Sequence, residues 1–179
     1  MKQKIAVVSL GDCRRPFYNT RKHIADEETE KLVRELETVY EVYAPEVVFS
    51  IDDALAVADE IRRRLIVQVM IHIPIWVTPN LVLRVAESTP YPVILFGNAR
   101  KDSSSTVALL ASAGVLSQCG KPHKRIIGDI RDPEIMKQVQ DVLGAVAAAD
   151  GLKRSSFGMI GGRSIGIGTT VADPMQWQR

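Results

Sequence analysis

The sequence predicts an α/β protein in which a parallel sheet lies between two layers of helices. Five short apolar segments alternate with five amphipathic ones along the 179 residues, an order typical of parallel strands joined by helices. The strand-like segments have no obvious polar face, as expected of parallel strands covered on both sides. The length suits one full domain with a core and is too short for two ordinary ones.

The first half of the chain contains three expected strands and two expected helices. Residues 4–10 have an apolar, β-branched centre, and an irregular loop over residues 11–19 follows. Ser50 resembles an N-cap and Asp53 its matching acid, a capping box with Asp in place of Glu. The expected strands cover residues 4–10, 39–44 and 65–73, and the expected helices cover residues 22–38 and 50–64.

The second half continues the alternation with clear start and stop signals. Thr78-Pro79 predicts a helix start, with Thr as the cap and Pro at the first helical position. Asp132-Pro133-Glu134 begins the last helix, which we expect to end at Gly151. The expected strands cover residues 93–96 and 124–128, and the expected helices cover residues 79–89, 106–118 and 132–150.

Right-handed crossovers place helices on both faces of such a sheet. We therefore predict a three-layer αβα sandwich with a five-stranded parallel sheet and a Rossmann-like or flavodoxin-like strand order. Residues 1–152 would form this N-terminal domain. Residues 153–179 would form the opening strand and glycine-rich turn of an incomplete second domain, because Trp177 is a large apolar residue with nothing after it to bury it.

The charge distribution excludes some partners. The hydrophobic fraction of 46%, the charged fraction of 25% and the net charge of +2 are those of a soluble globular protein. Basic residues cluster only in Arg14-Arg15, in residues 62–64 and in residues 121–125, so we expect no nucleic-acid partner. The triple arginine over residues 62–64 also suits the last turn of a helix, where cations offset the helix dipole.

Cysteine content and hydropathy indicate a compartment. Cys13 and Cys119 are too few and too far apart for a zinc site or a disulfide framework. Together with the lack of a signal peptide they predict the cytoplasm. The apolar run over residues 65–77 is interrupted by polar residues and is shorter than the roughly 20 residues that a membrane helix needs, so we expect no membrane partner.

Ligands of an open parallel sheet gather beyond the carboxyl ends of its strands. Arg14 and Arg15 are the best candidates there, because a guanidinium binds hydroxyls, carboxylates or phosphates; either could instead pair structurally with an aspartate, and chemistry does not separate the two. Trp76 could present its ring to a sugar or belong to the core, and His72 reads more readily as a core histidine. The full set after the first, third and fourth strands is Asp12, Arg14, Arg15, Tyr18 and Asn19; His72 and Trp76; and Asn98, Arg100, Lys101 and Asp102.

Motifs of common enzymes do not follow these strands. The first strand lacks the G-x-G-x-x-G of a dinucleotide site. No Ser-His-Asp or Cys-His arrangement has a supporting motif, and no cluster of Glu, Asp and His has the character of a metal site. The residues alone thus favour a binding or assembly domain, with no catalytic and no metal-binding residue.

Four segments carry a family resemblance. Asp12-Cys13-Arg14-Arg15 resembles an Asp-x-Arg-Arg loop after an opening strand, and Ile73-Pro74-Ile75-Trp76 resembles a strand end with a tryptophan. Phe96-Gly97-Asn98 is similar to a Gly-Phe-Asn region, and residues 157–173 resemble the strand and turn that begin a second domain. In this order, the segments resemble the L-fucose isomerase family, which includes L-arabinose isomerase-like proteins.

The resemblance implies a role in a larger enzyme. The family interconverts aldoses and ketoses through an enediol with a divalent metal, usually Mn²⁺, held with the catalytic carboxylates in its second and third domains. The chain resembles only the first domain, so the implied Mn²⁺ belongs to the complete enzyme and none to this chain. We expect a fragment or small subunit that is inactive by itself.

The resemblance also implies partners and site residues. Family members assemble as hexamers in which the first domain covers a neighbour's active site, so the expected partners are a sugar substrate and a homo-oligomer or the remaining isomerase domains. Arg14 and Trp76 would face the sugar in trans, within a substrate-binding set that also contains Arg15 and Asn98. Cys13 stands where the fucose enzymes have glycine, which leaves the sugar open.

Two other hypotheses remain at this point. The chain could be a stand-alone Rossmann-like domain that binds a sugar or sugar phosphate without catalysis. It could also be a complete small enzyme that uses His72 and Asp102, which is the weakest of the three readings.

Overall fold

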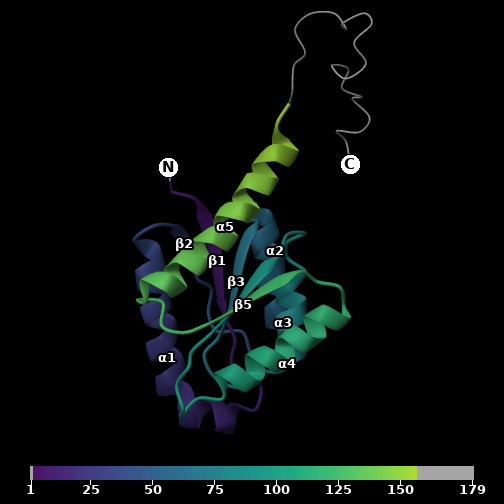
Figure 1. Cartoon of the computed structure of the whole chain (residues 1–179). Coiled ribbons are helices and arrows are strands. Elements are labelled where there is room, and N and C mark those ends of the chain that lie inside the picture. Colours follow the sequence, from purple (N-terminus) through teal and green to yellow (C-terminus); the bar gives the residue numbers. More distant parts are fainter. Residues whose placement is uncertain (1, 157–179) are drawn as a thin grey trace, which may run out of the picture.

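The computed structural model describes residues 2–156, which form a five-stranded sheet covered by helices on both faces (Figure 1). All pairings are parallel, and the strand order is β2-β1-β3-β4-β5. This flavodoxin-like order confirms the predicted three-layer fold. The elements in chain order are β1 (Lys4–Ser9), α1 (Arg15–Glu37), β2 (Glu41–Tyr43), α2 (Ile51–Arg63), β3 (Gln68–Ile73), α3 (Pro79–Ala86), β4 (Val93–Gly97), α4 (Ser105–Gln118), β5 (His123–Ile127) and α5 (Pro133–Arg154).

The sheet has an apolar core on each face. Alternate residues of a strand point to opposite faces, so in β3 Ile71 belongs to the core under α2, α3 and α4, and Met70 to the core under α1 and α5. All residues of β3 and β4 are buried. Each fully buried aliphatic side chain contributes roughly 1.5–3 kcal/mol, which explains why the sequences of these two strands are mostly apolar.

Helix α1 begins at Arg15, earlier than the sequence pattern predicts, and the expected loop over residues 11–19 is wrong from that residue on. Pro16 lies in the first turn, where its fixed φ suits a helix and its missing N–H costs nothing. The turn before the helix is closed by Asp12, whose Oδ1 accepts the backbone N–H of Arg14 at 2.9 Å. No Ser, Thr, Asp or Asn stands directly before Arg15, so the usual start signal was missing.

Helix α2 begins with the predicted capping box. Ser50 Oγ accepts the N–H of Asp53 at 3.1 Å, and Asp53 Oδ2 accepts the N–H of Ser50 at 3.0 Å. At the other end, the arginines of residues 62–64 pair with acids of the preceding turn, including Arg64 Nε with Glu60 Oε1 at 2.6 Å. The reading of this triple arginine as a helix C-terminus is thus confirmed.

The C-terminal turn of α2 includes residues that were expected to begin the next strand. Leu65 has φ of 55°, the left-handed conformation, and Ile66 N–H reaches back to Ile61 C=O at 3.1 Å. A left-handed residue followed by this hydrogen bond is the Schellman motif of helix C-termini, in which glycine usually occupies the left-handed position. β3 therefore begins at Gln68, and the predicted start of this strand at residue 65 is wrong.

Helix α5 continues through Gly151, which was expected to end it, as far as Arg154. A Cβ at Gly151 would meet no atom within 4 Å, so this glycine lies in open space within the helix. The last turns project beyond the body of the molecule (Figure 1). The predicted second-domain opening, with its glycine-rich turn and Trp177, lies outside the described residues, and the boundary after residue 152 stays a prediction.

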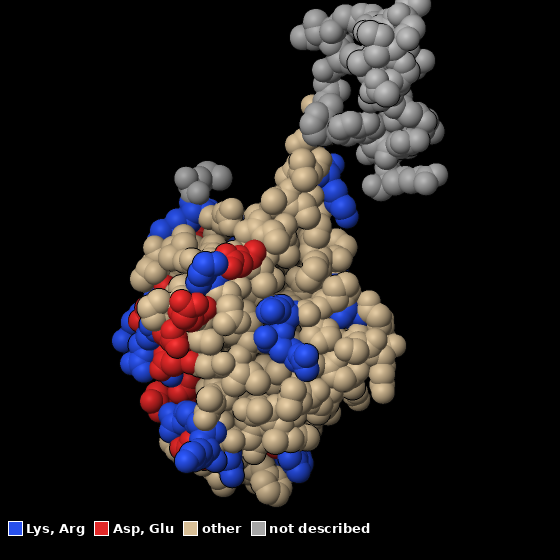
Figure 2. Space-filling model, viewed as in Figure 1, with Lys and Arg blue, Asp and Glu red and all other residues tan. Residues whose placement is uncertain are grey.

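Charge is distributed unevenly over the surface. Figure 2 shows Lys, Arg, Asp and Glu gathered over α1, whereas the surface over α4 is largely uncharged. Helix α4 contains no charged residue, and its Val107 and Leu110 are exposed. Among residues 2–156, no helix is both long enough and apolar enough to cross a membrane.

Candidate functional site

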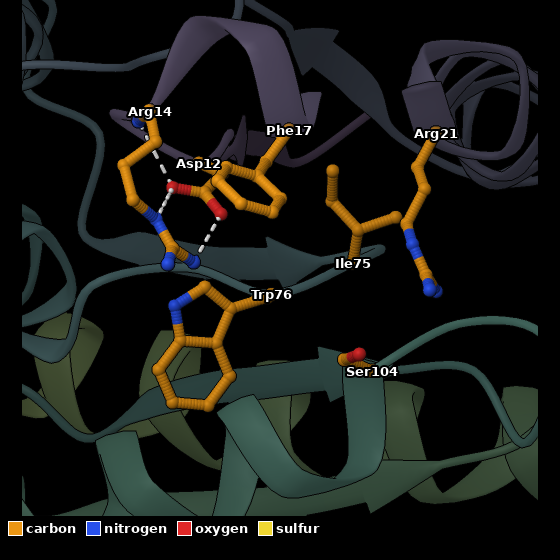
Figure 3. A pocket seen from close by; sticks show the side chains of 7 residues that line it. All are labelled: Asp12, Arg14, Phe17, Arg21, Ile75, Trp76 and Ser104. Carbon is orange, nitrogen blue, oxygen red and sulfur yellow. Dashed lines mark hydrogen bonds and ion pairs between the residues drawn. The ribbon is translucent and has the colours of Figure 1, made fainter. Parts of the chain in front are cut away.

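The chain leaves β1 toward α1 on one face of the sheet and leaves β3 toward α3 on the other. This divergence is the switch point at which open parallel sheets bind ligands. A cavity of about 240 Å³ opens there (Figure 3). Its lining comes from the loops after β1 and β3, the start of α1 and the residue before α4: Asp12, Arg14, Phe17, Arg21, Ile75, Trp76 and Ser104.

A clamped guanidinium forms one side of this cavity. Arg14 Nε and Nη2 donate to the two carboxylate oxygens of Asp12 at 3.0 and 2.7 Å. The Asp12 side chain is 5% exposed and that of Arg14 is 55% exposed, so the pair has a buried anchor and an open end. The Arg14 hydrogen bonds hold the pKa of the Asp12 carboxyl below its usual range despite burial, which raises it. The unused N–H groups of Arg14 can still donate to a ligand.

Trp76 faces this guanidinium across the cavity (Figure 3). Its indole is half-buried and packs against the core beneath α2, α3 and α4. The two sequence readings of Trp76 therefore both apply: one part of the ring belongs to the core, and the rest lines the cavity. An aromatic face beside a fixed donor is an arrangement that suits a sugar, whose C–H surface packs on the ring while its hydroxyls bind the donor.

Arg15 lies outside this cavity. Its Cζ stacks 3.5 Å from the centroid of the Phe49 ring, and it lines two neighbouring hollows near the start of α2. A close approach fixes Phe49 here, because a Cβ at Gly11 would lie only 2.2 Å from that ring. The geometry thus separates the two adjacent arginines, which chemistry alone could not, and places Arg14 at the cavity.

Asn98 also lies outside the set of residues that line the cavity, and its side chain is engaged within the protein. Its Nδ2 donates to Pro74 C=O at 2.7 Å, and its Oδ1 accepts from Ser103 Oγ at 2.7 Å. Pro74 is two residues before Trp76, so Asn98 ties the end of β4 to the loop that presents the indole. Its predicted contact with substrate stays a prediction, and its observed role is to position that loop.

Arg21 and Phe17 line the cavity, although sequence reasoning passed over them as ligand-facing residues. Phe17 lies in the expected loop over residues 11–19, and Arg21 lies just before residue 22, where the helix was expected to begin. Once the helix begins at Arg15, Phe17 and Arg21 are four residues apart and share one face with Arg14. The signal that could have found them was Pro16, because proline favours the first turn of a helix.

His72 is a core histidine, as the sequence indicated. It is 1% exposed, and its Nδ1 lies 3.0 Å from Ser9 Oγ and 3.3 Å from Thr29 Oγ1. Burial lowers its pKa to about 3, with a smaller effect from Lys31, so the ring is neutral near pH 7. Asp102, its suggested partner in a small enzyme, instead accepts hydrogen bonds from Arg100 at 3.0 and 2.9 Å.

Metal-binding side chains are not gathered in the part of the chain that the structure describes. Within residues 2–156, no group of three or more His, Cys, Asp or Glu side chains is placed to hold a metal ion. The cavity itself contributes one carboxylate, that of Asp12, and both of its oxygens accept hydrogen bonds from Arg14.

The fold and the cavity together define an α/β domain of the flavodoxin-like strand order with a ligand-sized hollow at its switch point. Sequence comparison identifies the family. The family model described as L-fucose isomerase, first N-terminal domain, matches residues 2–153, and the chain belongs to this family. The resemblance carried by the loops after β1, β3 and β4 is thereby confirmed. A comparison with the curated proteins found no match.

Proposed function

We propose that this chain forms one wall of a sugar site in a fucose-isomerase-like aldose–ketose isomerase, completed by other domains or by a neighbouring subunit. The observation that carries the proposal is the Asp12–Arg14 fork facing Trp76 across the switch-point cavity. The cavity is about 240 Å³, below the roughly 300–1,000 Å³ typical of complete ligand pockets. A partial site of this size suits a wall better than an enclosing pocket.

In this proposal the chain orients the sugar, and the chemistry takes place elsewhere. Arg14 would donate to sugar hydroxyls, while Trp76 covers the C–H face and excludes water. A divalent metal, Mn²⁺ by family resemblance, would polarise the carbonyl and hydroxyl oxygens of the substrate when bound. Its ligands would come from the second and third domains, and the complete oligomer would act in the cytoplasm.

The proposal predicts the kinetics of two variants of the assembled enzyme. Arg14→Ala and Trp76→Ala should each raise the KM for the sugar, in the first case by about 10- to 100-fold because a charge-assisted hydrogen bond is lost. Metal affinity should stay unchanged, because neither side chain would touch the metal. The measurement is a ketose-detection assay with L-fucose and Mn²⁺ on the chain combined with the downstream domains.

Arg15→Ala is the matched control, because it removes an adjacent guanidinium that stacks on Phe49 outside the cavity. Its KM should remain that of the unaltered enzyme. Unchanged kinetics in both Arg14→Ala and Trp76→Ala would contradict the sugar wall.

A second candidate is a stand-alone sugar or sugar-phosphate binding domain without catalysis. It is favoured by the position of the cavity at the switch point, where open parallel sheets bind ligands by themselves. A monomer that binds a sugar tightly would support this candidate, whereas an oligomer that binds none alone would support the isomerase wall. Isomerase activity from the chain alone would contradict both.

A further inference from the structure

We propose that the cavity takes a sugar that carries an oxyanion, and that Arg21 with Ser104 binds this group. The inference rests on the proposed sugar site and specifies its substrate class. A carboxylate and a phosphate share the required chemistry, since both present coplanar or clustered oxygens that accept two parallel hydrogen bonds from a guanidinium.

The side chains that line the cavity carry an excess of positive charge. Three charged side chains line it: Asp12, Arg14 and Arg21. The first two neutralise each other through a fork at 3.0 and 2.7 Å. Among residues 2–156, Arg21 has no carboxylate within ion-pair distance, and its Nη1 donates to a neutral acceptor, the backbone C=O of Asp102, at 2.5 Å. One positive charge therefore remains uncompensated in a concave site.

A hydrogen bond fixes the direction of the Arg21 side chain. The bond to Asp102 C=O holds the Arg21 guanidinium against the loop that precedes α4. Figure 3 shows it directed toward Ser104, on the side of the cavity away from Arg14. The carboxylate of Asp102 does not neutralise it, because this group is occupied by Arg100 at 2.9 Å.

Ser104 adds a hydroxyl at the same end of the cavity. It occupies the N-cap position of α4, but its side chain makes no capping hydrogen bond. The hydroxyl is therefore able to donate to a ligand oxygen without breaking a helix contact. A half-buried donor and a guanidinium at one end, with Arg14 and Trp76 at the other, match a sugar with one anionic end.

A neutral sugar would use this site poorly. Covering Arg21 with hydroxyl groups would remove water from a cation without supplying an opposite charge, which costs free energy. An oxyanion instead compensates the cation and forms charge-assisted hydrogen bonds, which are about twice as strong as neutral ones. The difference should appear as a preference for an anionic sugar over its neutral parent.

The test is a calorimetric binding titration of the full chain combined with the downstream domains, the same assembly as in the kinetic test. L-Fucose is the neutral probe, L-fuconate the carboxylate probe and L-fucose 1-phosphate the phosphate probe, with inorganic phosphate as the anion without a sugar. At least one anionic sugar should bind 10-fold or more tightly than L-fucose, and its identity distinguishes carboxylate from phosphate.

Substitution of Arg21 tests which residue carries the preference. Arg21→Gln should weaken the affinity for the preferred anionic sugar by about 10- to 100-fold and leave the affinity for L-fucose unchanged. Arg21→Lys should restore part of the lost affinity. Arg34→Gln is the matched control, because Arg34 lies on the same helix but pairs with Glu30 on the exposed surface. It should change neither affinity.

Equal affinity of the assembly for L-fucose and both anionic sugars overturns the oxyanion subsite, and so does an assembly that binds no anionic sugar at millimolar concentration. An equal loss of affinity for the neutral and the anionic sugars in Arg21→Gln also overturns the oxyanion subsite. These outcomes concern Arg21 and the wild-type ligand preference only. The sugar wall fails separately, through unchanged KM in the Arg14 and Trp76 variants of the assembled enzyme.

Discussion

The Asp12 carboxylate is nearly buried and accepts three hydrogen bonds from Arg14, one from its backbone N–H and two from its guanidinium. The backbone bond closes the turn that starts α1, and the side-chain bonds aim the guanidinium at the cavity. Asp12 is thus a positioning residue that couples the local fold to the site. Arg15, one residue later, points away and packs on Phe49.

His72 makes the stability of the protein depend on pH. Its folded-state pKa is about 3 because it is buried, whereas an unfolded histidine titrates near 6.5. Between these values the unfolded chain binds a proton that the folded chain does not, so acid favours unfolding. His72 should lower the free energy of unfolding by about 1.4 kcal/mol per pH unit between about pH 6 and pH 4, and it should contribute no slope above pH 7.

Urea unfolding of the wild type and of His72→Gln, followed by circular dichroism over a series of pH values, measures this slope. The variant should lose that part of the slope between about pH 6 and pH 4, whatever its stability at pH 8. Identical slopes in the two proteins would show that His72 is protonated in the folded state over this range.

At the level of whole elements, helix ends decide where the site residues lie. The start of α1 at Arg15 brings Arg14, Phe17 and Arg21 onto one helix face beside the cavity. At the end of β4, Gly97 allows Ser105 to approach closely, since a Cβ there would lie 2.7 Å from Ser105 Oγ. Ser105 Oγ in turn donates to Ile73 C=O at 2.5 Å and so links the ends of β3 and β4.

The end of α2 provides a stabilising substitution. Leu65 adopts φ of 55°, a conformation that costs a non-glycine residue roughly 1–2 kcal/mol. Its side chain is 71% exposed, so little burial is lost on truncation. Leu65→Gly should therefore raise the free energy of unfolding by about 0.5–1 kcal/mol after the greater backbone entropy of glycine is subtracted.

Leu65→Ala is the control for this prediction, because alanine removes the same exposed side chain but keeps the Cβ that makes the conformation costly. Its stability should stay close to that of the wild type in chemical denaturation. A Leu65→Gly chain no more stable than Leu65→Ala would mean that the left-handed conformation carries no cost here.

At the level of the whole molecule, the strand order places the site. β1 and β3 are neighbours although α1, β2 and α2 separate them in the sequence. Their carboxyl ends lie together where the two crossovers leave on opposite faces, so a cavity remains that neither helix fills. The loops of Asp12 and Trp76 come together for this reason, and Ser104, the residue before α4, lines a third side.

The same architecture predicts a gradient of local stability. All residues of β3 and β4 are buried, whereas the buried residues of α5 end at Val146. Amide hydrogens of these two strands should exchange only through global unfolding, and those of α5 beyond Val146 should exchange much faster through local fraying. Native-state hydrogen exchange of the full chain measures both classes.

Leu65→Gly serves as an internal control in that experiment. It should slow exchange in β3 and β4, which report global stability, and leave the end of α5 unchanged. Equal protection of β3 and of the last turns of α5 would show that these turns are covered in solution.

Much of the fold followed from local patterns. Apolar runs such as residues 69–73 predicted buried strands, and the Ser50–Asp53 capping box was found as expected. Errors fell at helix ends, at Arg15, Leu65 and Gly151, where the deciding contacts were not the usual signals. An Asp three residues earlier replaced an ordinary N-cap, and a leucine took the position of glycine.

The sequence by itself determined the fold class and the family, because the apolar patterns of strands and helices and the short loop motifs each depend on residues close together in the chain. Only the tertiary structure decided which arginine lines the cavity, that Asn98 holds the Trp76 loop, and that Arg21 faces the same hollow. These facts depend on contacts between residues far apart in the chain: Asn98 with Pro74, and Arg21 with Asp102. Such contacts exist only once the parallel sheet has brought the carboxyl ends of its strands to one edge.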